Sequence, residues 1–142
     1  VISVVIMEPL TVPGNLDSLS TISCYAIAAA NLANLDRKAA YQFRLSIDEI
    51  ATNIIIHGYE ESGLAGVLVL SAKLDDRALT LCIEDTGAPY DWTQKAKPEQ
   101  LEMPIEHRPI GGLGVYLAMQ GVDRFTYERV GARNRTCFII HR

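Results

Sequence analysis

The pattern of apolar positions is clearest in the stretch of residues 43–57, where it follows the period of an α-helix. Phe43, Ile47, Ile50 and Ile54 are spaced i, i+4, i+7 and i+11 along the chain. This spacing places the four side chains along one stripe of a helix. We expect the stripe to face the core.

A row of polar side chains lies beside that stripe. Glu49, Asn53 and His57 recur every four residues, so a carboxylate, an amide and an imidazole stand on one helical face, a turn apart. Such a row is often a plain solvated face, because amphipathic helices are common. Two glycine-containing motifs farther along the chain favour a functional role for it.

The remaining pattern predicts alternating strands and helices. Residues 3–10 predict a strand that ends before a turn at T-V-P-G-N, residues 11–15, and residues 16–35 predict a helix. Asp36 can cap the next helix, which carries Glu49 and ends near residue 58. The other expected elements are a hairpin of strands 66–74 and 78–84, a helix at 115–119, and strands 124–130 and 136–141 around a G-A-R-N turn.

This order of elements predicts an α+β fold. We expect a two-layer sandwich with helices on one face of a mixed or antiparallel sheet, formed by one domain that covers residues 1–142. Residues 88–109 interrupt the pattern with four of the six prolines, several charges and no sustained period. A long irregular segment inside a domain is typically a lid or disordered, and this one ends at a glycine motif.

Composition narrows the functional class. A hydrophobic content of 49% with 21% charged residues is typical of a folded domain. The net charge of -4, without a basic run, gives no support to direct nucleic-acid binding and favours a protein partner. No apolar run approaches the roughly eighteen residues of a membrane span. The first residue is Val, so the chain can be a piece of a longer protein.

The three cysteines predict neither a disulfide nor a zinc site. Cys24, Cys82 and Cys137 are odd in number and far apart in the chain. They fit no disulfide framework and no zinc-ligand spacing. We therefore expect a reducing compartment, the cytoplasm.

The D-T-G-A-P motif begins where a predicted strand stops. Asp85 at that point can accept a hydrogen bond from the amino group of a base, and Gly87 would let the backbone approach the ring closely. The same residues also make a good turn, so the motif alone leaves both interpretations open.

The G-G-L-G motif precedes the predicted helix at 115–119. Free backbone N–H groups and the positive end of a helix dipole favour phosphate binding there. The glycines would also suit a hinge, but the neighbouring lid favours phosphate. The residues of the motif are Gly111, Gly112, Leu113 and Gly114.

The polar row of the central helix would complete such a site. Asn53 offers an amide oxygen suited to magnesium, and Glu49 could act as a general base beside a terminal phosphate. Other phosphate and zinc motifs are absent from the sequence: G-x-x-x-x-G-K-[ST], G-x-G-x-x-G, H-R-D and H-E-x-x-H. We expect His57 to cap the helix end or line the site.

These motifs together resemble the boxes of one enzyme family. I-D-E-I-A-T-N-I-I-I-H-G-Y resembles the N box, D-T-G-A-P the G1 box and G-G-L-G-V the G2 box of the GHKL ATPases. The H-G-Y, the proline after the G1 box and the small size look most like the anti-sigma-factor serine kinases of bacterial partner-switching systems. The resemblance covers nearly all 142 residues and implies the Bergerat α/β sandwich.

The resemblance also implies a role for each site residue. Glu49 matches the family's catalytic base, and Asn53 its magnesium ligand. Asp85 matches the aspartate that binds adenine, with Gly87 beside it, and Thr136 resembles a threonine used near the adenine. The residues implied for binding phosphate are Gly111, Gly112, Leu113 and Gly114.

The implied activity is that of an ATP- and magnesium-dependent serine/threonine protein kinase. As an anti-sigma factor it would bind a sigma factor and phosphorylate a STAS-type anti-sigma antagonist, and family members often pair as homodimers. Two other functions fit the same motifs: a non-catalytic, nucleotide-gated binding module, and the ATPase domain of a larger signalling protein such as a histidine kinase. Retention of Glu49 favours the kinase over the binding module.

Overall fold

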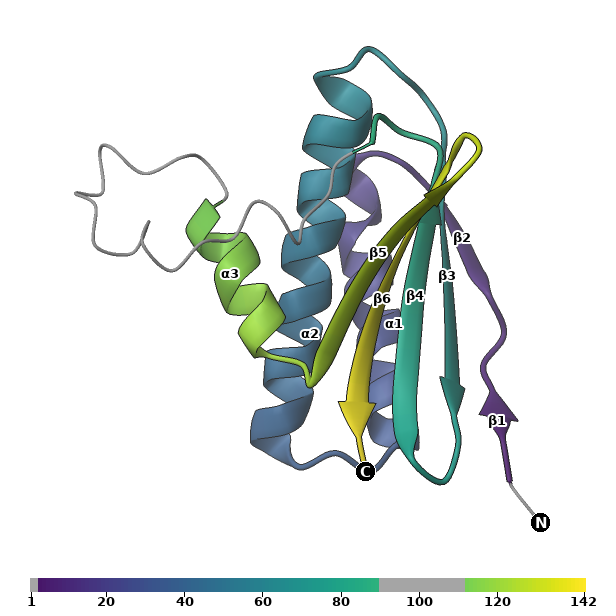
Figure 1. Cartoon of the computed structure of the whole chain (residues 1–142), viewed down its shortest axis with the longest axis vertical. Coiled ribbons are helices and arrows are strands. Elements are labelled where there is room, and N and C mark those ends of the chain that lie inside the picture. The colour runs from purple at the N-terminus through teal and green to yellow at the C-terminus, as the bar shows by residue number, and fades with distance from the viewer. Residues whose placement is uncertain (1–2, 90–111) are drawn as a thin grey trace.

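The protein folds as a sheet with its helices gathered on one side (Figure 1). The structure, a computed structural model, describes residues 3–89 and 112–142, without the side chains at positions 112, 113, 116 and 117. This architecture confirms the expected two-layer α+β sandwich. Among the described residues, no helix combines the length and apolar character needed to cross a membrane.

Within the described residues the sheet has six strands, and every pair of neighbours runs antiparallel. The strand order is β1-β3-β4-β6-β5, and β2 pairs with the same strand, β3, as β1 does. The sheet is therefore antiparallel, whereas the sequence analysis had allowed either a mixed or an antiparallel sheet. The strands are β1 (Val5–Ile6), β2 (Leu10–Pro13), β3 (Val67–Leu74), β4 (Ala78–Asp85), β5 (Arg124–Val130) and β6 (Arg133–His141).

The expectation of one N-terminal strand followed by a turn was wrong. The chain forms two short strands, β1 and β2, separated around Pro9, which has no N–H to donate to a ladder. The carbonyl of Glu8 instead accepts a hydrogen bond from the Tyr25 hydroxyl at 3.0 Å. The residues expected as a turn pair with β3, with Thr11 opposite Val69.

The helices begin largely where the sequence predicts. Asn15 caps a 3-10 turn, and the Asp36 side chain accepts a hydrogen bond from the Ala39 N–H at 2.8 Å, which confirms the predicted cap of the central helix. The last helix begins within the G-G-L-G motif, so Gly112 and Gly114 lie in its first turn and not ahead of it. The helices are η1 (Leu16–Ser18), α1 (Leu19–Leu32), α2 (Arg37–Asn53), the π-helical η2 (Ile54–Glu60) and α3 (Gly112–Gln120).

The apolar stripe of α2 lies in the core, as expected. Phe43, Ile47 and Ile50 are completely buried, and Ile54 is 2% exposed. α2 packs between α1 and α3, and α1 also contacts β3 and β4 (Figure 1). This packing fixes the rotation of α2, and with it the direction of the polar row that includes Glu49.

The connection between β5 and β6 is tighter than predicted. Only Gly131 and Ala132 lie outside the strands, and Gly131 has a φ of 63°, in the left-handed region that glycine adopts at little cost. Arg133 and Asn134, expected in a G-A-R-N turn, belong to β6 and pair with Val130 and Arg129 of β5. Asn134 is therefore a strand residue near one end of β6, between β4 and β5.

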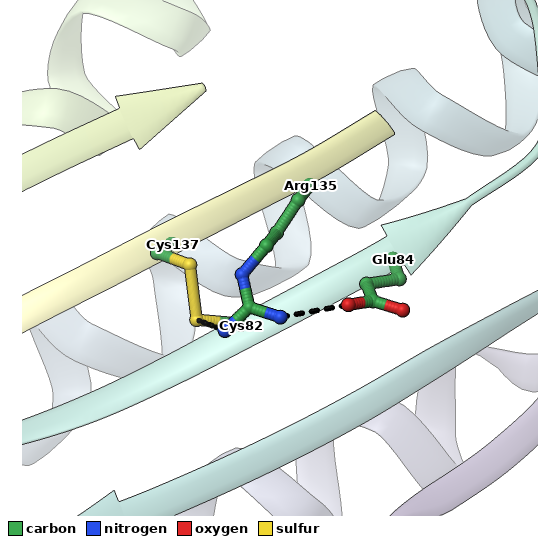
Figure 2. The surroundings of a disulfide bond; sticks show 4 residues. All are labelled: Cys82, Glu84, Arg135 and Cys137. Atoms are coloured by element: carbon green, nitrogen blue, oxygen red, sulfur yellow. Dashed lines mark hydrogen bonds and ion pairs between the residues drawn. A yellow bond between two sulfur atoms is a disulfide. The ribbon is translucent and has the colours of Figure 1, made fainter. Parts of the chain in front are cut away.

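The prediction that no cysteines pair was also wrong. Cys82 of β4 and Cys137 of β6 form a disulfide with Cα atoms 4.1 Å apart, and Cys24 is free and exposed. Figure 2 shows the Arg135 side chain of β6 beside this disulfide, extending to Glu84 of β4. Arg135 Nη1 donates to Glu84 Oε1 at 2.7 Å. The pairing follows from strand register, because Cys82 and Cys137 are directly opposite one another although 55 positions apart in sequence. The cytoplasmic location was inferred from cysteines that fit no disulfide, so it loses that support and stays a prediction.

Candidate functional site

The site residues that the structure describes fall into two groups. The helical half, which we define as Glu49, Asn53 and Gly114, lies on α2 and α3. The strand half, which we define as Asp85, Gly87, Asn134 and Thr136, lies at one end of β4 and β6 and in the loop after β4. The loop that carries Gly87 contacts η2, which continues the chain directly after Asn53: the Ala88 N–H donates to the Gly58 carbonyl at 2.9 Å.

Within the helical half, Glu49 and Asn53 are hydrogen-bonded to each other. The Asn53 side-chain Nδ2 donates to the Glu49 carbonyl at 2.7 Å and to Glu49 Oε1 at 3.1 Å. Asn53 is buried, whereas Glu49 is partly exposed. Because the amide nitrogen faces Glu49, the amide oxygen is left for another partner, and it is the oxygen that would ligate magnesium.

Gly114 packs directly against the Glu49 carboxylate. A Cβ atom at position 114 would overlap Glu49 Oε1 and lie 2.6 Å from Glu49 Cδ. The glycine of the third motif thus leaves room for the carboxylate of the first in its observed position. A cavity of about 620 Å³ opens between α2 and α3, and Glu49 and Gly114 are part of its lining.

His57 lies a turn beyond Asn53, in η2. Its Nδ1 is 2.7 Å from Glu61 Oε2, and its carbonyl accepts a hydrogen bond from the Ser62 hydroxyl at 2.8 Å. These contacts are consistent with a role at the helix end. Across residues 3–89 and 112–142, no three His, Cys, Asp or Glu side chains are grouped as metal ligands.

In the strand half, Asp85 is 5% exposed and tightly bonded through one oxygen. Its Oδ1 accepts from the Gly87 N–H and from Asn134 Nδ2, both at 2.9 Å. Burial raises the pKa of the Asp85 carboxyl, and this rise is opposed by the hydrogen bonds from Asn134 and Gly87 and by the charge of Arg129. No described residue bonds to Oδ2, so that oxygen is available to a ligand.

The position of Gly87 is explained by a contact within the protein. A Cβ atom there would lie 2.7 Å from the Gly58 carbonyl oxygen and 3.0 Å from Gly58 Cα. Glycine at 87 therefore lets the loop after β4 pack on the backbone of η2. The predicted close approach of Gly87 to a base stays a prediction.

Thr136 supplies a buried hydroxyl without a partner. The residue is completely buried on β6, opposite Ile83 of β4, and its Oγ1 has no hydrogen-bond partner within the described part of the chain. An orphaned buried hydroxyl is costly, and in native proteins it usually bonds to a water or a ligand. Thr136 and the free oxygen of Asp85 together fit a polar ligand such as a base.

Asn134 is the site residue that the sequence analysis missed. Its side chain contacts Asp85, Gly87, Tyr127 and Arg129, although the sequence placed it in a turn. The predicted phosphate residue Gly111 and positions 90–109 of the predicted lid lie outside the described residues. Leu113 lies in the first turn of α3, but its side chain is not described.

Comparisons with known proteins agree with this geometry. Three similar proteins are the serine-protein kinases RsbW of Bacillus thuringiensis (strain Al Hakam), Bacillus cereus (strain 03BB102) and Bacillus anthracis. Each is 26% identical over 111 residues, which cover 76% of this chain and 68% of the relative.

A family model gives broader coverage. The model of the histidine kinase-like ATPase domain matches residues 12–140, which span the sheet from β2 to β6 and all the helices between them. The matched region contains both halves of the site. The chain belongs to the histidine kinase-like ATPase family.

Proposed function

We propose that the protein is an ATP- and magnesium-dependent serine/threonine protein kinase. The observation that carries this proposal is the joint placement of Glu49, Asn53 and Gly114, which puts a carboxylate and an amide on one helical face against the first turn of α3. The family and the relatives named serine-protein kinase support it.

Each residue has a defined task in this proposal. Asp85 Oδ2 accepts a hydrogen bond from the amino group of the adenine, and the Thr136 hydroxyl offers a second polar contact nearby. The Asn53 amide oxygen holds magnesium, and the first turn of α3 directs backbone N–H groups at phosphate. ATP supplies the phosphoryl group that is transferred.

Glu49 is the general base of the proposed reaction. Its carboxylate takes the proton from the acceptor serine hydroxyl, which attacks the terminal phosphorus and releases ADP. The hydrogen bond from Asn53 and the contact with Gly114 keep Glu49 Oε1 in place, so groups of α2 and α3 position the base. A cavity beside Glu49 gives the acceptor a route of approach.

For the partners we propose the assignment that the family resemblance implies. The protein binds a sigma factor, phosphorylates a STAS-type anti-sigma antagonist, acts in the cytoplasm and forms a homodimer. Support comes from the similarity to serine-protein kinases named RsbW. The phosphoacceptor is a serine or threonine hydroxyl, which is the group that a carboxylate base can deprotonate in such a transfer.

The test separates Glu49 from Asn53. In Glu49→Gln the shape is kept but the basicity is lost, so phosphate transfer from labelled ATP to the antagonist should fall about a hundred- to ten-thousand-fold while ATP affinity survives. Asn53→Ala should instead weaken binding only when magnesium is present. The matched control is Glu60→Gln, which removes an exposed carboxylate of η2.

Two outcomes would contradict the proposal. Wild-type transfer rates in Glu49→Gln would remove the general base and favour the nucleotide-gated binding module. Failure of the wild-type protein to bind ATP, measured by calorimetry with magnesium, would remove the nucleotide site altogether.

A further inference from the structure

Asn134 is a buried side chain whose four hydrogen-bonding directions are all used. It is 3% exposed on β6, directly opposite Asp85 of β4 and Arg129 of β5. Its Nδ2 donates to Asp85 Oδ1 at 2.9 Å and to the Gly87 carbonyl at 3.0 Å. Its Oδ1 accepts from the Tyr127 hydroxyl at 2.6 Å and from Arg129 Nη1 at 2.9 Å.

These partners allow only one orientation of the Asn134 amide. Arg129 can only donate, so the amide oxygen must face it. The Gly87 carbonyl and the ionised Asp85 carboxylate can only accept, so the amide nitrogen must face them. A flip of the amide would set donor against donor at Arg129 and acceptor against acceptor at Asp85 and Gly87.

The orientation of Asn134 determines the orientation of Asp85. Oδ1 of the carboxylate is held by Asn134 from β6 and by the Gly87 N–H from the loop after β4. The second oxygen, Oδ2, consequently has no bond from a described residue and is the one left for a ligand. Arg129 adds a contact at 3.3 Å to the Gly87 carbonyl, so the same loop is tied to β5 as well.

We propose that Asn134 is a positioning residue for nucleotide binding: it presents one oxygen of Asp85 to the base as an acceptor and thereby selects an adenine over a guanine nucleotide. The inference rests on the proposed nucleotide site. An acceptor-only oxygen suits the amino group of adenine, whereas guanine would offer a carbonyl oxygen at that edge. Asn134 itself does not touch the base.

The charge state of Asp85 connects this role to a measurable pH dependence. Burial raises the pKa of the Asp85 carboxyl, and the hydrogen bond from Asn134 works against that rise. Arg129 of β5 is the charged group that acts on Asp85, and the phenols of Tyr127 on β5 and Tyr59 on η2 are the titratable neighbours. Loss of Asn134 therefore moves protonation of Asp85 to higher pH.

The experiment compares Asn134→Ala with wild type by calorimetry, using ATP and GTP with magnesium across a pH series. Affinity for ATP should fall roughly ten-fold near neutral pH. The decline of affinity with falling pH should begin at higher pH in the variant, and the preference for ATP over GTP should narrow. Each affinity of the variant is divided by the wild-type affinity for the same nucleotide at the same pH. This ratio removes the effect of phosphate titration, which is the same for both proteins.

Two further variants keep the test decisive. Arg133→Ala, beside Asn134 on the same strand, has its exposed side chain on Glu84 and should keep wild-type affinity and pH profile. If Asn134→Ala does not fold, Asn134→Ser retains a short donor, and the same shift in the pH profile is expected, although smaller. A structural role alone would lower the melting temperature without moving the pH profile or the ATP preference.

The outcomes distinguish this inference from the proposed kinase activity. A folded Asn134→Ala or Asn134→Ser with unchanged ATP affinity, pH profile and ATP preference overturns the positioning role and leaves the kinase intact. A wild-type protein that binds ATP but transfers no phosphate overturns the kinase while the positioning role is still measured. A wild-type protein that binds no ATP overturns both.

Discussion

The strand half and the helical half of the site are held in place by different kinds of structure. Asp85, Asn134 and Thr136 lie on strands that are paired in register along β4 and β6, and each is at most 5% exposed. Glu49 and Gly114 lie on two helices, and Glu49 is partly exposed beside a cavity. The strand half is thus fixed by a hydrogen-bonded ladder, and the helical half by the packing of α3 on α2.

This difference suits the two tasks in the proposed reaction. Recognition of a base requires polar groups of fixed direction in a dry environment, where an unmade hydrogen bond is costly. Phosphate transfer to a protein requires access for a large partner and room for a hydroxyl to approach the base catalyst. We expect substitutions in the strand half to change nucleotide affinity, and those at Glu49 and Gly114 in the helical half to change the rate of transfer.

After Glu49→Gln, the largest expected effect in this comparison comes from Gly114→Ala. The new methyl group would overlap the end of the Glu49 side chain, which is flexible and can rotate away. Phosphate transfer should therefore fall up to about a hundred-fold, because displacing a catalytic group by about 1 Å has consequences of that size. The melting temperature and ATP affinity should change little. Full transfer activity would show that Glu49 is not held by this contact.

A double-mutant cycle checks that Gly114→Ala acts through Glu49. Added to Glu49→Gln, the alanine should have no further effect on transfer, since the base has already been lost. A further loss of similar size would mean that the alanine disturbs α3 or the phosphate contacts instead.

Much of the helical half could be predicted from the sequence because a helix has a fixed local period. The spacing of Glu49 and Asn53 places them a turn apart whatever the rest of the fold does, and the structure joins them by a hydrogen bond. The buried stripe from Phe43 to Ile54 was predictable for the same reason. Local spacing said nothing about the contact between Gly114 and Glu49, which depends on how α3 packs against α2.

The strand half was less predictable because its contacts depend on register. Asp85 was recognised from a local motif, but its partner Asn134 is 49 positions away and was placed in a turn. The pair Cys82 and Cys137 was missed for the same reason. Shifting a strand by a single residue turns every side chain to the other face, so such pairs cannot be found without knowing which residues are opposite.

The next largest effect is expected from Asp85→Asn in the strand half. The amide can turn a donor toward the amino group of the base, and it loses the charge that strengthens the hydrogen bond. A charged hydrogen bond contributes about 1.5 to 3 kcal/mol, so ATP affinity should fall about ten- to a hundred-fold in calorimetry. Transfer at saturating ATP should be affected much less. Unchanged affinity in a folded variant would remove Asp85 from the site.

The smallest effect on the site is expected when the disulfide is reduced. Cys82 lies three positions before Asp85, and Cys137 directly follows Thr136, so the bond is close to the strand half in sequence. β4 and β6 are nevertheless paired from Ala78 opposite His141 to Asp85 opposite Asn134, and this ladder keeps the register without the bond. ATP affinity should therefore change no more than about two-fold, or about 0.4 kcal/mol.

Stability should respond more strongly than affinity, since the disulfide closes a long loop in the unfolded chain. The expected loss is about 2 to 4 kcal/mol, seen as a lower melting temperature in dithiothreitol or in Cys137→Ser. The control is Cys24→Ser, which removes only the free, exposed thiol and should behave as wild type. A ten-fold loss of ATP affinity on reduction would show that the disulfide, and not the ladder, holds Asp85 and Thr136 in place. The contrast between a strand half fixed by pairing and a helical half fixed by packing would then be wrong.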